Sequence, residues 1–172
     1  MKKERHPTPR NIKIRKATIR DAIALRKLRF ELVKENPRAY GVVYSTERKK
    51  GVDHYARWIK EYCQRDSAMF LLFVKNKLVG MSAIKRDNAS IPEVGYVGSL
   101  GVLSDYQGKG LGRLLIDCRV EWAKKHTKFK KIKTIISRDN KKMLQIAQKN
   151  GFKIVGEGKY YGVPELYLEK EL

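Results

Sequence analysis

The stretch Gln107-Gly108-Lys109-Gly110-Leu111-Gly112 decides how this 172-residue sequence is interpreted. It lies between an apolar, strand-like run from Val94 to Leu103 and an amphipathic helical run that begins near Leu111. Glycines in a strand-to-helix turn allow positive φ angles and let several N–H groups point at one anion, and the helix N-terminus adds a favourable potential. The turn therefore predicts a site for a phosphate-bearing ligand, with Lys109 and Arg113 adding positive charge.

Two better-known glycine motifs do not fit this turn. A dinucleotide fingerprint requires G-x-G-x-x-G, whereas the spacing here is G-x-G-x-G. A Walker loop requires Ser or Thr after Gly-Lys, whereas Gly110 follows Lys109. A glycine-rich helix start without any ligand remains an alternative for the hexapeptide taken alone.

Hydrophobic periodicity along the chain predicts the order β, α, α, β, β, β, α, β, α, β, β, which indicates an α/β fold with a mixed sheet. The expected strands are 12–17, 68–74, 78–84, 94–103, 132–137, 152–155 and 164–168, and the expected helices are 18–34, 53–64, 111–126 and 139–150. The stretch between Pro37 and Gly51 is expected to be irregular, and the polar stretch from Arg86 to Pro92 is expected to end the preceding strand.

The glycine turn resembles motif A of the GCN5-related N-acetyltransferase (GNAT) family, Q/R-x-x-G-x-G/A, which here is Gln107-x-x-Gly110-x-Gly112. A second family signature follows in the same order: a strand, then Asn140, a helix, and the pair Gly151-Phe152. The segment from Asn36 to Gly41 also looks like the loop in which a subgroup of the family carries acceptor specificity. The resemblance covers one domain, residues 12–172, preceded by a flexible basic arm, residues 1–11.

The resemblance implies a mostly antiparallel sheet that is splayed between its two central strands, with acetyl-CoA as cosubstrate in the splay. It implies that the main chain of Leu100, Gly101 and Val102 meets the pantetheine and thioester, that a backbone N–H near Val102 stabilises the oxyanion, and that Asn140 contacts the cofactor. The residues implied for the pyrophosphate are Gln107, Gly108, Lys109, Gly110, Leu111, Gly112 and Arg113. The function implied is acetyl-CoA-dependent N-acetylation of a primary amine of a small molecule, peptide or protein.

The usual catalytic side chains of the family are missing. The tyrosine found seven residues after the conserved asparagine corresponds to Ala147, and a strand glutamate of one branch corresponds to a position near Ile135; neither residue can exchange a proton. The substitutes that the sequence offers are Glu93, Tyr96, Tyr160 and Tyr161. An exposed strand-start charge for Glu93, packing for the tyrosines, and proton transfer through solvent remain alternatives.

The 39 Lys and Arg against 18 Asp and Glu give a net charge of +21, which predicts attraction of anionic partners. Nucleic acid and ribosomes are possible partners on this ground alone, and a solvated basic surface is the alternative. The rival function is therefore a non-catalytic module of the same fold that binds acyl-CoA or nucleic acid.

The cysteine, histidine and hydropathy patterns argue against a disulfide-stabilised, a metal-binding or a membrane-spanning protein. Cys63 and Cys118 are isolated on apolar helix stripes, so buried thiols are expected and a disulfide framework is not. His6, His54 and His126 lack metal-ligand spacing, so no metal is expected. There is no membrane-length apolar run and no signal-peptide core, which favours a soluble cytoplasmic protein without membrane insertion, either a monomer or a homodimer.

Overall fold

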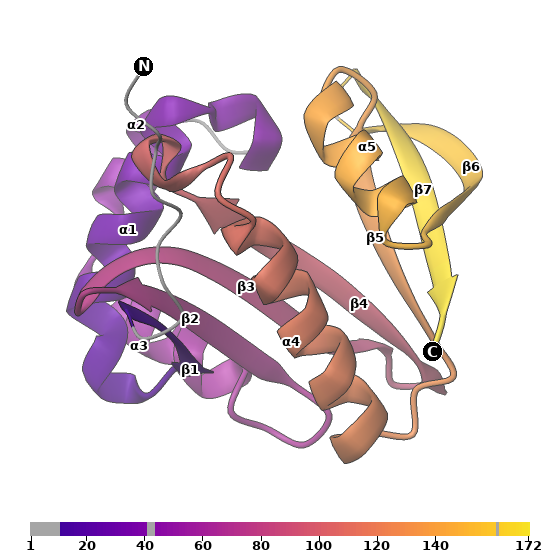
Figure 1. Cartoon of the computed structure of the whole chain (residues 1–172), viewed down its shortest axis with the longest axis horizontal. Helices are drawn as coiled ribbons and strands as arrows, with labels where there is room; N and C mark the ends of the chain where they lie inside the picture. The colour runs from indigo at the N-terminus through magenta and orange to yellow at the C-terminus, as the bar shows by residue number, and fades with distance from the viewer. Residues whose placement is uncertain (1–10, 41–43, 161) are drawn as a thin grey trace.

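The computed structural model describes residues 11–40, 44–160 and 162–172, and these form a seven-stranded sheet flanked by helices (Figure 1). The strands are β1 (Ile12–Lys16), β2 (Ala68–Val74), β3 (Lys77–Asn88), β4 (Ile91–Val102), β5 (Lys131–Ser137), β6 (Lys153–Tyr160) and β7 (Val163–Glu171). The α-helices are α1 (Ala22–Glu35), α2 (Tyr44–Lys49), α3 (Val52–Glu61), α4 (Leu111–His126) and α5 (Lys141–Lys149), and the 3-10 turns are η2 (Ile19–Asp21), η3 (Pro37–Tyr40) and η4 (Ser104–Tyr106). The predicted α/β class is confirmed.

The sheet is mixed, because its strand order is β1-β2-β3-β4-β5-β7-β6 and only β4 and β5 are parallel neighbours. Side chains of β2 show how its faces are covered. Met69 and Leu71 pack with α1 and α3, whereas Phe70 and Leu72 pack with α4. Leu144 of α5 belongs to the same cluster as α4. One face of the sheet therefore carries α1 and α3, and the other carries α4 and α5.

A β-bulge interrupts β4 near its C-terminal end. In the β3–β4 register Met81 is opposite Gly101 and Ala83 is opposite Gly98, so β4 contains one extra residue. Ser99, within the bulge, has a left-handed φ of +52°. Bulges bend the strand that carries them, and this one directs the end of β4 away from its neighbour β5.

The two central strands separate after three paired positions. β4 and β5 pair at Val94 with Lys131, Gly95 with Ile132 and Tyr96 with Lys133, and no further pair follows. Both strands nevertheless continue, β4 to Val102 and β5 to Ser137, and Figure 1 shows them diverging toward the start of α4. The splay that the family resemblance implied is therefore present, and it lies next to the glycine-rich turn.

Three local expectations are corrected. The stretch expected to be irregular contains η3 and the short helix α2, which packs against α1. The polar stretch Arg86–Pro92 does not break the sheet, because β3 runs to Asn88 and β4 starts at Ile91, and the two strands pair there as a hairpin. Cys63 is exposed rather than buried, because α3 ends at Glu61 and no longer holds it against the core.

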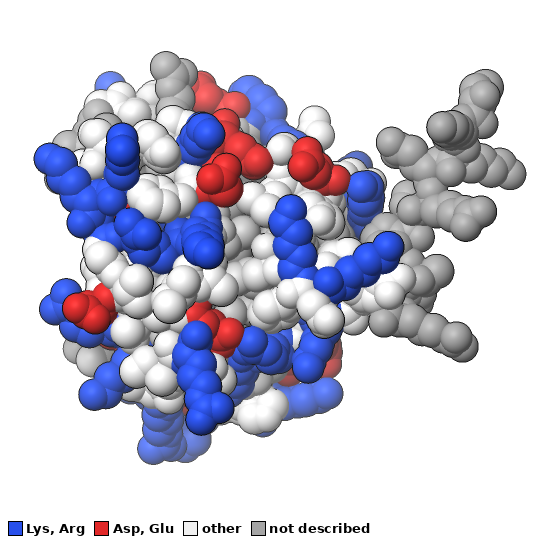
Figure 2. All heavy atoms as spheres, turned by 90° about the vertical axis from the view of Figure 1, so that its left-hand side faces the viewer, with Lys and Arg blue, Asp and Glu red and all other residues white. Residues whose placement is uncertain are grey.

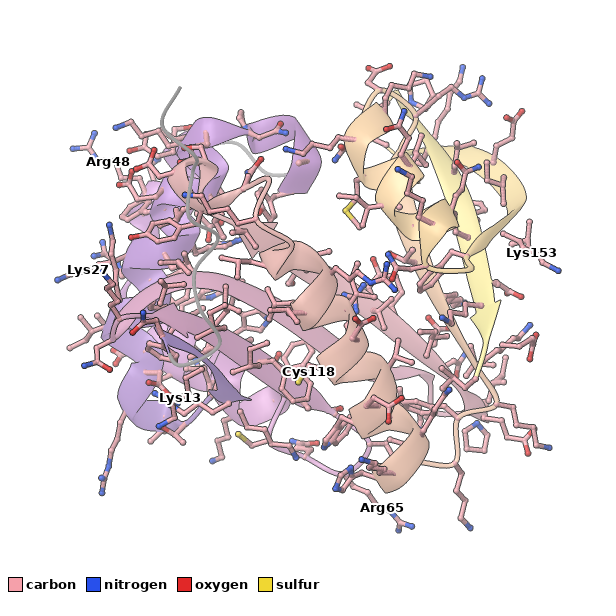
Figure 3. All side chains as sticks on the ribbon, in the orientation of Figure 1. Lys13, Lys27, Arg48, Arg65, Cys118 and Lys153 are labelled. Atoms are coloured by element: carbon pink, nitrogen blue, oxygen red, sulfur yellow. The ribbon has the colours of Figure 1, made fainter. Side chains whose placement is uncertain are left out.

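The positive charge is spread over the surface. Figure 2 shows Lys and Arg side chains across the face that carries α1, with Asp and Glu among them. Lys13, Lys27, Arg48 and Lys153 point away from the fold (Figure 3). The predicted basic arm lies outside the described residues except for Asn11. No helix within the described ranges has the length and apolarity needed to cross a bilayer.

Candidate active site

The turn before α4 presents a run of free backbone donors. Gly108 and Gly110 have φ angles of +74° and +76°, and the first N–H of this region with a helical acceptor is that of Leu114, which donates to Gly110 O at 3.1 Å. In the described part of the chain, the N–H groups from Gly108 to Arg113 donate to no acceptor. A Cβ added at Gly108, Gly110 or Gly112 would find no atom within 4 Å. These six N–H groups form an open cradle suited to an anion.

The Gln107 side chain connects this cradle by hydrogen bonds to the end of β4 and to the start of α5, on the two sides of the splay. Its Nε2 donates to Val102 O at 2.8 Å, at the end of β4, and its Oε1 accepts from Lys142 Nζ at 2.6 Å, at the start of α5. Lys109 Nζ donates to Asp105 O at 2.9 Å within the turn. The amines of Lys109 and Lys142 thus lie beside the cradle. Lys142 was missed by the sequence analysis, because its only signal was a position two residues after Asn140.

Asn140 lies where β5 gives way to α5. Its Oδ1 accepts from Met143 N–H at 3.1 Å, so the side chain caps the helix. The predicted cofactor contact of Asn140 would therefore be made by its remaining amide N–H groups or by the main chain. Because Lys142 reaches Gln107, the start of this helix faces the cradle across the splay.

Leu100, Gly101 and Val102 follow the bulge, on the edge of β4 that β5 has left. On the face of α1, a Cβ at Gly101 would collide with the Tyr40 hydroxyl, so only glycine allows this close approach. Tyr40 belongs to η3, its ring centre is 4.2 Å from the Arg29 guanidinium carbon, and burial raises its pKa to about 12. The loop expected to carry acceptor specificity therefore reaches the splay.

Tyr96 lies at the closed end of the splay. Val97 packs toward α4, so Tyr96 projects to the face of α1 and α3, and a Cβ on Gly98 would lie 3.0 Å from the Tyr96 ring. Burial is the main cause that raises the pKa of Tyr96, and the charge of Glu165 adds to it. Of the four predicted catalytic candidates, Tyr96 is therefore the one whose side chain is described beside the unpaired part of β4.

Arg119 of α4 lies under the bulge on the opposite face of the sheet. Its side chain is buried, its Nη1 donates to Gly98 O at 3.5 Å, and its Nε has no hydrogen-bond partner among the described residues. Burial lowers its pKa to about 10. The sequence pointed to cofactor-binding residues only at the start of this helix, residues 111–113, and periodicity gave no signal for the buried Arg119.

The other catalytic candidates lie elsewhere or are not described. Glu93 is exposed at the closed end of the sheet and pairs with Lys130 at 2.6 Å. Nine residues of strand separate it from Val102, which corresponds to about 30 Å. Tyr160 ends β6, where only its backbone is described, and Tyr161 lies outside the described residues.

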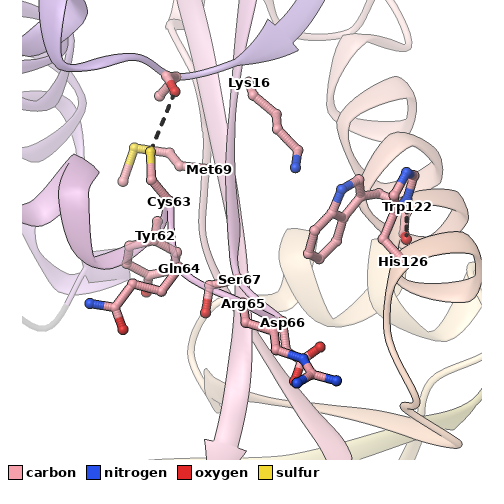
Figure 4. Close-up of a pocket in the computed structure, with 11 residues that line it drawn as sticks. Lys16, Tyr62, Cys63, Gln64, Arg65, Asp66, Ser67, Met69, Trp122 and His126 are labelled. Atoms are coloured by element: carbon pink, nitrogen blue, oxygen red, sulfur yellow. Dashed lines mark hydrogen bonds between the residues drawn. The ribbon is translucent and has the colours of Figure 1, made fainter.

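A separate hollow of about 390 Å³ lies at the C-terminal end of α4 (Figure 4). Lys16 Nζ stands 4.6 Å from the centre of a Trp122 ring, and His126 stacks on that tryptophan at 5.5 Å. Cys63 borders the hollow, and its thiol donates to Ala17 O at 3.8 Å. The α4 helix separates this hollow from the cradle at its N-terminus, so the two are distinct places on the molecule.

A model of the acetyltransferase (GNAT) family matches residues 29–152, which include the splay, the cradle and the start of α5. The chain belongs to the GNAT acetyltransferase family. No curated protein matches this GNAT sequence.

Solved structures share the fold of this GNAT chain at low sequence identity. An acetyltransferase of the GNAT family from Streptococcus pneumoniae is 19% identical with a TM-score of 0.79, covering 94% of this chain and 99% of its own. A putative acetyltransferase from Salmonella typhimurium, solved with acetyl-CoA, is 17% identical with a TM-score of 0.78, covering 94% of each chain. A ribosomal-protein-alanine N-acetyltransferase from Brucella melitensis is 21% identical with a TM-score of 0.79, covering 93% of this chain and 99% of its own.

Proposed function

We propose that this GNAT protein is an acetyl-CoA-dependent N-acetyltransferase that transfers the acetyl group to a primary amine. The observation that carries the proposal is the splay. The last pair between β4 and β5 is Tyr96 with Lys133, and both strands continue beyond it without pairing to each other. Unpaired backbone groups in a sheet interior are costly, so a chain of amides lying between the strands would be stabilised by completing their hydrogen bonds. The pantetheine arm of acetyl-CoA is such a chain.

The cradle at the start of α4 fits the other end of the same molecule. Six free N–H groups, two positive-φ glycines and the amines of Lys109 and Lys142 suit a diphosphate. The cradle and the splay meet at Gln107, whose side chain contacts the last residue of β4. A ligand that carries a diphosphate joined to an amide-containing arm therefore matches both features together.

Acetyl-CoA would supply an activated acyl group as a thioester, and the chain would supply position and polarity. Residues 100–102 would hold the thioester end along the free edge of β4, where a backbone N–H near Val102 would stabilise the developing oxyanion. The acceptor would enter from the face of α1 and α3, because β5 and β7 are exposed there at Ile135 and Tyr167, whereas α5 covers these strands on the other face. Holding the two reactants together would provide much of the rate acceleration.

The proposal is tested with the full chain in two steps. Acetyl-CoA should raise the melting temperature, and a panel of primary amines should then accelerate thiol release from acetyl-CoA. The absence of both effects would refute the proposal. A shift in melting temperature without thiol release for any amine would instead favour the non-catalytic acyl-CoA-binding alternative, which is motivated by the buried Ala147 at the position of the usual tyrosine.

A further inference from the structure

Glu165 is a half-buried carboxylate without an ion-pair partner among the described residues of this strongly basic chain. Six Asp and Glu side chains in the described ranges are buried or half-buried: Asp21, Glu47, Asp66, Asp87, Glu165 and Glu169. Five of them form ion pairs with Lys or Arg. Glu165 has neither an ion pair nor a hydrogen bond among the residues that the structure describes, although Lys and Arg outnumber Asp and Glu by 39 to 18.

The register of the sheet places Glu165 on the face of α1 and α3. Leu166 and Leu168 of β7 pack in the cluster beneath α4 and α5, so Glu165 projects to the opposite face. It is paired with Ser137, the last residue of β5, and therefore lies at the open end of the splay. This is the face from which the proposed acceptor would approach.

The surroundings of Glu165 combine two phenols with apolar surface. Its charge contributes to the raised pKa of Tyr96, which reaches this face from β4 on the other side of the splay. Ile135 and Tyr167 are paired across β5 and β7 on the face of Glu165, and both are unusually exposed for large apolar residues, at 42% and 38%. Tyr167 leans toward Gly158, which is opposite Glu165 in the β6–β7 register.

We propose that Glu165 receives the ammonium group of the acceptor and takes its proton, with Tyr96, Ile135 and Tyr167 contacting an apolar stem that carries that ammonium. This inference rests on the proposed N-acetyltransferase function and names the acceptor subsite. An unpaired, half-buried carboxylate binds a cation readily. Burial also raises the pKa of Glu165, which suits a general base. The local negative charge overcomes the repulsion between a cationic acceptor and the positive chain.

The acceptor ammonium loses two protons in the reaction, and one of them goes to the enzyme. The ammonium gives one proton to the Glu165 carboxylate, and the neutral nitrogen forms the C–N bond as the C–S bond breaks. The second nitrogen proton goes to the departing thiolate, and Glu165 later returns its proton to solvent. The titratable groups described on this face also include Tyr96, Tyr167, Glu171 and two ion pairs, Lys133 with Asp87 at 2.6 Å and Lys131 with Glu169 at 2.8 Å.

A binding experiment tests the subsite without turnover. n-Butylammonium chloride is titrated into the coenzyme A complex of the full chain, and the Glu165 side-chain carboxyl is followed by NMR. We expect Glu165→Gln to weaken amine affinity about tenfold while acetyl-CoA affinity and melting temperature stay unchanged. Glu171→Gln removes the same charge from the exposed end of β7 on the same face and should bind like wild type. Equal affinity of wild type and Glu165→Gln, or no binding by wild type, overturns the subsite.

A kinetic experiment tests the proton transfer. Glu165→Gln should lower kcat/KM for the amine by about 100-fold and should recover activity as pH rises toward the pKa of the free amine. Transfer with wild-type kcat/KM and an unchanged pH profile in this variant would overturn the inference while leaving the N-acetyltransferase function intact. Amine binding through Glu165 without acetyl transfer to any amine would instead refute that function and leave the ammonium subsite assigned.

Discussion

Replacing Gly110 by alanine tests the cradle at its most constrained point. Gly110 is the N-cap of α4 with φ at +76°, and an added methyl group would meet no atom within 4 Å. The free energy of unfolding should therefore fall only by the cost of a left-handed alanine, about 1–2 kcal/mol. This corresponds to a decrease in melting temperature of about 2–8 °C for a chain of this size.

The effect of Gly110→Ala on ligand binding should be larger. The methyl group would occupy the open space beside the six N–H groups and hold a diphosphate away from them. Losing one charge-assisted hydrogen bond costs about 1.5–3 kcal/mol, so the Kd for acetyl-CoA should rise about 10- to 100-fold in isothermal titration calorimetry. Gly110→Asp adds a negative charge at the same point and should abolish measurable binding.

Gly151→Ala is the matched control. Gly151 has φ at +83° and follows α5 at the end opposite to Lys142, and an added Cβ would make only an ordinary contact with Lys170 at 3.7 Å. It should lose similar stability and keep wild-type affinity for acetyl-CoA. Equal Kd values for the two alanine variants would refute the assignment of the cradle.

Three further outcomes follow from buried charge and net charge. Glu47→Ala should lower the free energy of unfolding in urea by about 3–5 kcal/mol, and Glu47→Gln by less, because the buried carboxylate accepts from Tyr55 Oη at 2.5 Å. Arg15 holds the pKa of Asp21 at about 2, so the stability contributed by this pair is present above about pH 4 and is lost as pH falls toward 2. Arg15→Gln should reduce that loss, and unfolding curves recorded between pH 7 and 2 measure it. Any RNA affinity caused by the +21 charge should fall steeply with salt in fluorescence anisotropy, and deleting residues 1–11 should flatten the slope; salt-independent binding would contradict this origin.

Local chemistry in the sequence accounts for the elements on which the site is built. A helix was predicted from Leu111 to about His126, and α4 spans Leu111–His126, because its apolar spacing and its glycine start are both local signals. The strands predicted at 68–74 and 78–84 rest on the same kind of signal, and they form β2 and the first part of β3. The open space and positive φ angles at the cradle likewise follow from glycines adjacent in sequence.

Strand pairing decided the remainder of the site. The insertion of β7 between β5 and β6 brings Glu165 near Tyr96, although 69 residues separate them. A short 3-10 turn brings Tyr40 against Gly101, and the start of α5 brings Lys142 to Gln107. The sequence determined which segments form helices and strands, because periodicity and turn residues act over a few positions. Only the tertiary structure decided which side chains share the splay, because sheet order and register depend on burying all the segments together.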